Sequence, residues 1–333
     1  MKRIVVGSLA VLMAGIAVNT TFAQVDPHFT QYYVHTSWLN PALTGIFDGS
    51  YRATAIYRNQ WGNVSSPYST VGASVEGSTN KDLNLGVNLI NQTAGDGGFK
   101  YTTAYANFAY TGVKFGANGY HRLVTALQVG LIQRRFNPSK LIFGDQWNPV
   151  TGATKPTAES FSNPTSSSFD AGAGLMYYDG TPGKKANAFA GFSASHLTRP
   201  ENKFSATGDE RIPIRYTIHA GVKIAVNDML SLTPHALFLK QGTAEEKMLG
   251  LLAQIRAAES TDLLLGMNYR YKDALSAHAG FSFKNMVLGL SYDVNTSDLG
   301  KAVSGTNSFE LSLTFTGRSK TKTPEVEFVC PRL

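Results

Sequence analysis

From about residue 50 onward, apolar and polar residues alternate with a period of two along most of the chain. The clearest run is 261–271, where leucine, methionine and tyrosine recur at every second position and aspartate, asparagine and arginine lie between them. The runs 275–283, 286–294 and 308–315 repeat this pattern. Such a period is that of a β-strand whose two faces meet different surroundings. The C-terminal part therefore predicts four consecutive strands.

Further segments with the same alternation bring the predicted total to fourteen strands. They lie near residues 50–58, 68–77, 83–92, 99–110, 121–136, 168–178, 186–195, 214–226, 229–239 and 249–257. An even number of antiparallel strands, each apolar on one face and polar on the other, is typical of bacterial outer-membrane barrels. The pattern predicts an all-β protein, a transmembrane antiparallel β-barrel of about 14 strands over residues 50–316.

The connections between predicted strands differ systematically in length. Those that join an even-numbered strand to the next are short, whereas 137–167 and 196–213 are the longest of the other set. The brief turn at Lys272 and Asp273 is an exception. Membrane barrels have short periplasmic turns at one end and long extracellular loops at the other. We therefore expect both barrel termini on the periplasmic side and the long loops on the cell exterior.

The first residues indicate an export signal. Lys2 and Arg3 precede an apolar run, and small residues up to Ala23 suit cleavage. We expect residues 1–23 to be a signal peptide, whose removal takes away two positive charges and lowers the net charge from +7 to +5. Later apolar runs all fall short of the roughly 18 residues of a transmembrane helix.

Two predicted parts lie outside the barrel wall. Residues 24–49 would either plug the lumen or hang in the periplasm, and residues 317–333 would form a periplasmic C-terminal tail. The tail holds Cys330, the only cysteine of the chain. In an oxidising compartment this thiol would either crosslink to a partner or remain a plain accessible residue.

Composition agrees with a barrel and offers little chemistry. Abundant glycine and aromatics, 32 Gly, 15 Tyr and 19 Phe, accompany a mean hydropathy of only −0.12. Lys and Arg form no run longer than a pair, which argues against a nucleic-acid partner. The sequence carries no G-x-S-x-G, H-E-x-x-H or Walker motif. We expect a non-enzymatic protein without catalytic residues, cofactor or metal; a hydrolase built from lumenal histidine and serine is one alternative.

Charged residues within the predicted strands are expected to face the lumen. An arginine on the lipid face at mid-bilayer would cost roughly 2–4 kcal/mol, so Arg58, Arg256 and Arg270 are placed inward. Asp145 and Asp170, or Asp293 and Glu310, could make a carboxylate pair or a calcium site. Because no spaced acidic loop accompanies them, lumenal charges are the simpler interpretation.

Residues 26–68 form the most distinctive stretch, dense in aromatics, Asn and Arg, and neither helix nor strand before Tyr51. Proline restricts the residue before it to extended geometry, and Asn40-Pro41 followed by Gly45 indicates a turn. The aromatics offer rigid packing surfaces. The residues expected to plug the barrel or bind a partner are Asp26, Pro27, His28, Phe29, Tyr32, Tyr33, Asn40, Pro41 and Gly45. The first strand should end at the outer rim or lumen with Arg58, Asn59, Gln60 and Trp61.

Several motifs resemble the PorP/SprF family, outer-membrane components of the type IX secretion system of Bacteroidetes. They are Asp26-Pro-His-Phe-Thr-Gln-Tyr-Tyr, Asn40-Pro-Ala-Leu-Thr-Gly, Tyr57-Arg-Asn-Gln-Trp, Pro67-Tyr68, Ser291-Tyr-Asp-Val-Asn-Thr-Ser and the ending Cys330, Pro331 and Arg332. The resemblance implies support for secretion or cell-surface attachment of cargo proteins, adhesins for gliding motility among them. It implies outer-membrane lipid, periplasmic secretion components including a peptidoglycan-binding lipoprotein, and cargo as partners.

A barrel of this size is too narrow to pass a folded protein, because even larger barrels enclose only a solute channel. We therefore interpret the chain as a scaffold or anchor. The alternative is a porin-like or hydrophobic-solute outer-membrane transporter, with residues 24–49 as its plug. The sequence leaves the cargo, the stoichiometry and the place of residues 24–49 open.

Overall fold

The computed structural model describes residues 26–318 except 63–66, 80, 96–97, 149, 153–154, 159–162, 202–203, 205–210, 299 and 301–305. The expected signal peptide, residues 1–23, lies outside the described residues. So does the expected tail beyond Arg318, with Cys330, Pro331 and Arg332.

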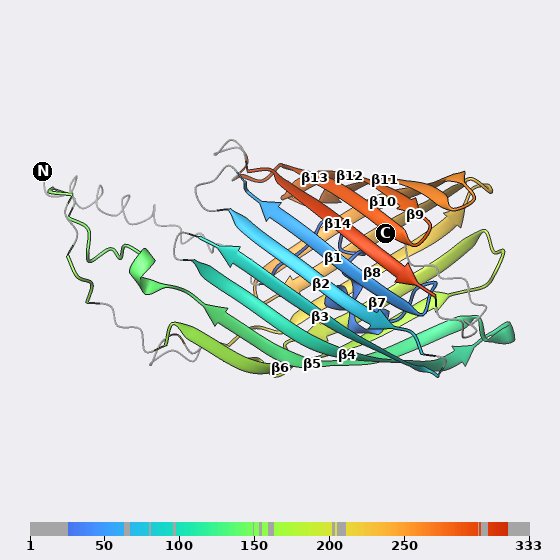
Figure 1. The fold of residues 1–333 in the computed structure, drawn as a ribbon, viewed down its shortest axis with the longest axis horizontal. Coiled ribbons are helices and arrows are strands. Elements are labelled where there is room, and N and C mark those ends of the chain that lie inside the picture. Colours follow the sequence, from blue (N-terminus) through green and yellow to red (C-terminus); the bar gives the residue numbers. More distant parts are fainter. Residues whose placement is uncertain are drawn as a thin grey trace, which may run out of the picture.

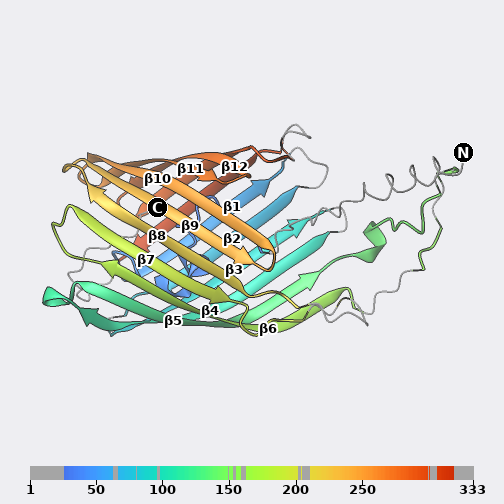
Figure 2. The same cartoon turned by 180° about the vertical axis from the view of Figure 1, so that it is seen from behind.

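The described chain forms one closed antiparallel barrel in which β14 pairs back to β1 (Figures 1 and 2). Its strands are β1 (Tyr51–Gln60), β2 (Tyr68–Gly77), β3 (Leu83–Ala94), β4 (Phe99–Phe115), β5 (His121–Arg135), β6 (Thr165–Asp179), β7 (Ala186–Ser195), β8 (Arg215–Ala225), β9 (Leu230–Gln241), β10 (Ala244–Ala258), β11 (Thr261–Arg270), β12 (Ala274–Phe283), β13 (Met286–Asn295) and β14 (Ser308–Gly317). The prediction of a fourteen-stranded barrel is confirmed.

The faces of the sheet are inverted relative to a water-soluble barrel. Large apolar side chains point outward and are exposed, for example Leu127 at 63% and Leu249 at 66%. Polar side chains point inward and are buried, as for Thr54, Asn88 and Gln128. An apolar exterior around a polar lumen is the arrangement that a barrel adopts in a lipid bilayer.

Helices are few and short: α2 (Thr36–Leu39), η1 (Pro41–Leu43), η2 (Ala117–Gly119) and η3 (Pro138–Lys140). Within the described part of the chain, none is long and apolar enough to cross a membrane. The first two lie inside the barrel, where all their residues are buried and η1 packs against β4, β5 and β6.

The two ends of the barrel differ as expected. We name the end where β1 begins and β14 ends the short-turn end, and the opposite end the long-loop end. The connections 136–164 and 196–214 both lie at the long-loop end. The two longest connections therefore lie at the end where the sequence placed them.

One connection at the long-loop end was placed wrongly from the sequence. Residues 240–248 were assigned to a loop, but β9 continues to Gln241 and β10 begins at Ala244. Gly242, with a φ of 59°, makes the tight turn between them. Lys240 pairs with Glu245 at 3.3 Å. Charged residues occupy the exposed face here, so the apolar alternation that marks a strand is lost.

A second boundary, that of β4, was also wrong. The sequence ended this strand at residue 110, whereas β4 runs to Phe115 after a register shift between Tyr110 and Val113. The shift interrupts the period of two, which hides the continuation. Both errors concern strand ends and leave the strand count unchanged.

The orientation of the barrel can be tested by labelling. Val150, in the β5–β6 connection, is 91% exposed, and Glu259, in the β10–β11 turn, is exposed at the other end. In a Cys330→Ser background, we predict that a membrane-impermeant maleimide labels Val150→Cys in intact cells. Glu259→Cys should react only after the outer membrane is opened. The opposite pattern would place the short turns outside.

Candidate functional site

Residues 26–49, which we name the inner segment, run through the lumen from one end of the barrel to the other (Figures 1 and 2). Asp26 bonds to Tyr101 and Arg215, which stand at the long-loop ends of β4 and β8. At the other end the nitrogen of Ser50 donates to the carbonyl of Gly317 at 2.8 Å. Almost every residue of the segment is buried.

The outer end of the segment is held by a buried ion cluster, which we name the Asp26 anchor. His196 places Nε2 2.6 Å from a carboxylate oxygen of Asp26 and Nδ1 2.7 Å from Asp170. Arg215 donates to Asp26 at 3.1 Å, and the Tyr101 hydroxyl donates to the other Asp26 oxygen at 3.1 Å. Since both imidazole nitrogens face carboxylates, both donate and the ring is an imidazolium.

The electrostatics of the Asp26 anchor follow from this geometry. Burial alone would lower the pKa of His196, but the two carboxylates outweigh it and raise the pKa to about 9. Burial alone would raise the pKa of Asp26, but the charges of His196 and Arg215 hold it well below its usual range. The cluster thus sets two carboxylates against His196 and Arg215, and the charge of Arg134 also acts on Asp26. His196 therefore has no free nitrogen with which to serve as a general base.

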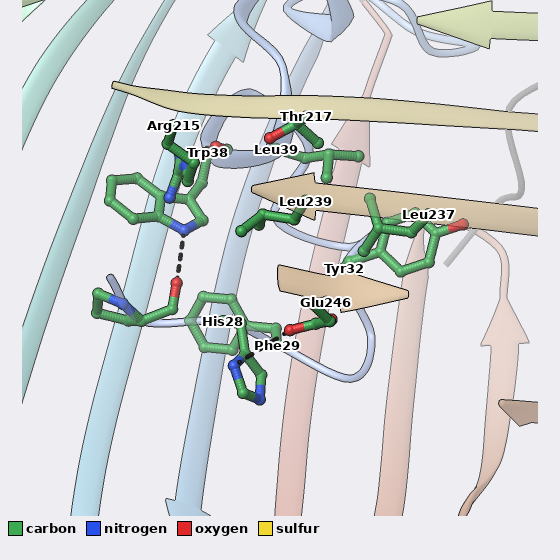
Figure 3. Close-up of a pocket in the computed structure, with 11 residues that line it drawn as sticks. His28, Phe29, Tyr32, Trp38, Leu39, Arg215, Thr217, Leu237, Leu239 and Glu246 are labelled. Carbon is green, nitrogen blue, oxygen red and sulfur yellow. Dashed lines mark hydrogen bonds and ion pairs between the residues drawn. The ribbon is translucent and has the colours of Figure 1, made fainter. Parts of the chain in front are cut away.

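Trp38 ties the anchor to the rest of the segment (Figure 3). Its indole N–H donates to the carbonyl of Pro27 at 3.0 Å, and its own carbonyl accepts from Arg215 at 3.0 Å. The Arg215 guanidinium also lies 4.3 Å from the centroid of the indole ring. Arg215 thus contacts the segment at two separate points, Asp26 and Trp38.

A second cluster, the Glu310 anchor, holds the backbone of the segment. Glu310 accepts from the backbone nitrogens of Thr30 at 2.6 Å and Gln31 at 2.9 Å. The same carboxylate pairs with Arg58 at 2.6 Å. Charge-assisted bonds of this kind are about twice as strong as neutral ones, so two consecutive peptide groups are firmly positioned.

Asp293 completes the Glu310 anchor. Its carboxylate accepts from the Thr30 hydroxyl at 2.8 Å, from Arg58 at 3.0 Å and from Arg270 at 2.9 Å. Two arginines therefore face these two carboxylates, and Arg270 also pairs with Asp273. The carboxylate pair considered from the sequence exists as part of this cluster of ion pairs. Among the described residues, no group of His, Cys, Asp or Glu is arranged to hold a metal ion.

A third polar contact lies near the short-turn end. Glu76 accepts from the Gly45 nitrogen at 2.9 Å and the Thr36 hydroxyl at 3.3 Å, and it pairs with Arg52 at 2.9 Å. Both charged side chains belong to the wall and are nearly inaccessible. The segment thus has anchors from its first residues to Gly45.

The predicted turn at Asn40 packs closely against the barrel wall and forms a hydrogen bond with its backbone. The Asn40 side chain accepts from the Ala42 nitrogen at 2.9 Å and donates to the Leu175 carbonyl at 2.9 Å. Gly174 and Gly191 face this turn from β6 and β7. A Cβ atom at Gly174 would collide with the Asn40 side chain, and one at Gly191 would lie 2.8 Å from its amide nitrogen. Side chains at these two wall positions would displace the turn.

The two tyrosines of the segment meet lumenal histidines. The Tyr32 hydroxyl lies 2.7 Å from Nδ1 of His235, and the Tyr33 hydroxyl lies 2.9 Å from Nδ1 of His278. The two tyrosine rings contact each other edge to face at 5.2 Å between centroids. Burial raises the pKa of Tyr33 well above its ordinary value, so this tyrosine stays neutral.

His28 is the other titratable group at the outer end. It lies 3.3 Å from Arg58 and 3.5 Å from Glu246 (Figure 3). Burial, together with the charges of Arg270 and Arg58, lowers the pKa of His28 well below its usual value. The ring is neutral, so it accepts from Arg58 and presents its N–H toward Glu246.

The structure brings the predicted plug or partner-binding residues together inside the barrel. These residues are Asp26, Pro27, His28, Phe29, Tyr32, Tyr33, Asn40, Pro41 and Gly45. Arg58 and Gln60 are buried in the lumen, whereas Asn59 is on the outer face and Trp61 packs edge to face on Tyr68 at the rim. A role in partner binding stays a prediction for all of them.

Sequence reasoning missed most of the wall residues that receive the segment. Glu76 and Arg52 lie at inward positions of their strands. Because the alternation of apolar and polar residues shows which positions face inward, this pair could have been predicted from the sequence. Arg215 likewise lies at an inward position of its predicted strand, 214–226, whereas His196 follows β7 in a loop and carries no such signal. Arg256, expected in the lumen, lies at the short-turn rim, where its side chain is 63% exposed beside Asp262.

Little space remains beside the outer part of the segment. The cavity there has a volume of about 30 Å³ and is lined by Pro27, His28, Phe29, Tyr32, Trp38, Leu39, Arg215, Thr217, Leu237, Leu239 and Glu246 (Figure 3). That is room for about one water molecule. The segment therefore fills most of the outer lumen.

The fold and the polar, occupied lumen define an outer-membrane β-barrel. The chain belongs to the PorP/SprF family: the family model described as type IX secretion system membrane protein PorP/SprF matches residues 21–315. This confirms the resemblance read from the motifs. Among curated proteins, no relative matches the chain.

Solved outer-membrane barrels share the fold at low sequence identity. The toluene transporter TbuX of Ralstonia pickettii has a TM-score of 0.53 and 12% identity, covering 84% of this chain and 92% of its own. The CymD monoaromatic hydrocarbon channel has a TM-score of 0.51 and 13% identity, covering 86% and 94%. The P. putida toluene transporter TodX has a TM-score of 0.50 and 9% identity, covering 85% and 93%.

The charge of His196 predicts a pH-dependent stability. A folded pKa of about 9 lies above the ordinary 6.5, so the stabilisation is complete below pH 6.5 and is lost as pH rises through about 9. The shift corresponds to at most about 3 kcal/mol. We predict that the midpoint of thermal unfolding in detergent falls between pH 7 and 10, and that His196→Gln shows no such fall. Parallel curves for both proteins would contradict an imidazolium at this position.

The Glu310 anchor predicts a second effect on stability. Glu310→Gln leaves Arg58 short of a buried counter-charge and should lower the free energy of unfolding by about 3 kcal/mol. The control is Glu201→Gln, because the pair of Glu201 with Arg211 is exposed and should contribute under about 1 kcal/mol. Unfolding midpoints in denaturant measure both. Equal unfolding midpoints for Glu310→Gln and Glu201→Gln would mean that the buried cluster does not stabilise the fold.

Proposed function

We propose that the protein is a non-enzymatic scaffold or anchor of the type IX secretion system in the outer membrane. In this role it supports the secretion or cell-surface attachment of cargo proteins, adhesins among them in gliding relatives. Its membership of the PorP/SprF family supports the secretion system as the setting.

The occupied lumen is the observation that favours a scaffold over a conduit. The inner segment crosses the lumen, is held by buried ion pairs, and leaves a cavity of only about 30 Å³ at its outer end. A larger hollow, of about 250 Å³, lies at the short-turn end beside Asn187, Gln254 and Arg256. A conduit requires a continuous open path. We therefore assign the inner segment the role of a plug, and its burial supports this role over that of a free docking segment.

With the inner segment filling the outer lumen, partners would meet the protein at its ends and its outer surface. We propose that periplasmic secretion components, including a peptidoglycan-binding lipoprotein, contact the short-turn end and the tail at 317–333. Cargo would contact the connections at the long-loop end. Outer-membrane lipid surrounds the apolar face.

The test is deletion of the gene, followed by mass spectrometry of secreted and cell-surface proteins. We predict that a defined set of proteins disappears from both fractions and returns when the gene is restored. The amounts of unrelated outer-membrane proteins serve as the control. An unchanged profile would overturn the assignment to secretion.

The fold similarity favours a transporter for small hydrophobic solutes as a second candidate. The solved barrels it resembles are described as toluene transporters and a monoaromatic hydrocarbon channel. Deletion would then abolish uptake of such a hydrocarbon and leave the secreted proteins unchanged. Normal uptake with altered secretion would leave the scaffold as the remaining candidate.

A further inference from the structure

β6 and β7 pair over only part of their length at the long-loop end of the closed barrel. β6 pairs with β5 along its whole length, from Thr165 to Asp179. Its pairing with β7 covers only the positions from Ala173 to Tyr178. Among the described residues, 165–172 of β6 therefore have a strand on one side and none on the other.

The Asp26 anchor is the reason for this gap. β7 stops at Ser195, and His196 takes a left-handed φ of 61° so that its ring turns into the lumen toward Asp26. Arg199 takes a second left-handed φ of 48°. Non-glycine residues rarely adopt this conformation, and the local strain is compensated by the buried ion pairs.

The described residues that follow His196 cover only part of the open edge. The Leu197 nitrogen donates to the carbonyl of Ala171 at 2.9 Å, and the Thr198 hydroxyl donates to the carbonyl of Phe169 at 3.2 Å. In a strand, alternate residues direct their backbone groups to the same side. Ser167 and Thr165 therefore direct theirs to the open side as well.

The next described residue beside β6 lies on its inner face instead. The carbonyl of Glu201 accepts from the hydroxyls of Ser166 and Ser168, at 3.3 and 3.2 Å. Both serines alternate with the outward residues of β6. Within the part of the chain that the structure describes, no backbone group pairs with Thr165 or Ser167 on the open side.

Unpartnered cations line the outer surface beside this edge. Arg135 pairs across the sheet with Thr165, and Lys100 pairs with Arg135, so the three stand in one row of the outer face. Arg135, Lys100 and Arg199 are exposed, and none makes an ion pair with any described residue. Glu201, the acid nearby, is already paired with Arg211 at 2.9 Å.

We propose that the open edge of β6, residues 165–169, binds an acidic extended segment of a secreted or cell-surface protein, which adds as a strand. An unpaired edge offers backbone donors and acceptors that another main chain complements. The row of cations favours acidic side chains on the added strand and speeds its encounter. This inference rests on the proposed role in secretion and names its docking surface.

Ser167→Pro tests the edge directly. Proline removes the N–H that points to the open side, while the bonds to β5 come from Ser166 and Ser168 and remain. Ser167→Ala keeps the N–H and is the matched control. In cells carrying each variant, the surface proteins that depend on the gene should fall at least about fivefold with proline, the equivalent of one lost hydrogen bond, and stay unchanged with alanine.

A second variant covers the case in which proline prevents folding, which the heat-dependent gel mobility of barrels would reveal. Arg135→Glu with Arg199→Glu changes two exposed side chains and should reduce the same surface proteins. If surface proteins stay at normal levels in both folded variants but are lost on gene deletion, docking at the β6 edge is wrong and the role in secretion still stands. No loss on gene deletion would overturn that role itself.

A photo-crosslinking residue in place of Ser167 distinguishes other occupants. The expected product joins the barrel to one of the proteins lost on gene deletion. A product of twice the barrel mass would assign the edge to a second copy of the chain. A product with lipopolysaccharide alone would assign the cations to lipid phosphates. Either result would overturn the proposal.

Discussion

Charge pairing inside the lumen is the constraint on which the structure depends. A buried charge without a partner costs several kcal/mol, so each lumenal charge needs a counter-charge beside it. In the Glu310 anchor the wall supplies the arginines and the carboxylates, and the segment adds only backbone N–H groups and a hydroxyl. In the Asp26 anchor the wall supplies His196, Arg215 and the carboxylate of Asp170, and Asp26 supplies the second carboxylate. The outer end of the inner segment is thus a charged component of the wall itself.

The irregular features of the wall follow from that requirement. His196 reaches Asp26 only because β7 stops early and the backbone turns through a left-handed conformation. Gly174 lacks a side chain where the Asn40 turn approaches. The inner segment gives both features their physical reason. The open edge of β6 is therefore a structural consequence of holding the segment at its outer end.

These relations explain how much the sequence could predict. Every wall residue faces either lipid or lumen, so the alternation is strong and gives the strand count, the inward position of Arg58 and the end with long connections. It fails at β4 and β10, where a register shift or charged exposed residues break the period. The distinctive stretch of residues 26–49 could be recognised as a set. Its partners could not, because Asp26 and His196 are 170 residues apart and meet only through the register of the closed barrel.

The fold that this chain shares with hydrocarbon channels and the residues that fill its lumen have separate origins. Strand number and the outward apolar band determine the course of the backbone, and any outer-membrane barrel of this size shares them even at 12% identity. The lumen is not subject to that constraint, so its residues can change independently of the fold. In this chain they form clusters of ion pairs around a segment of the same chain. Function should therefore be sought at the rims and edges of the barrel, where unpaired backbone and charge remain, rather than along its axis.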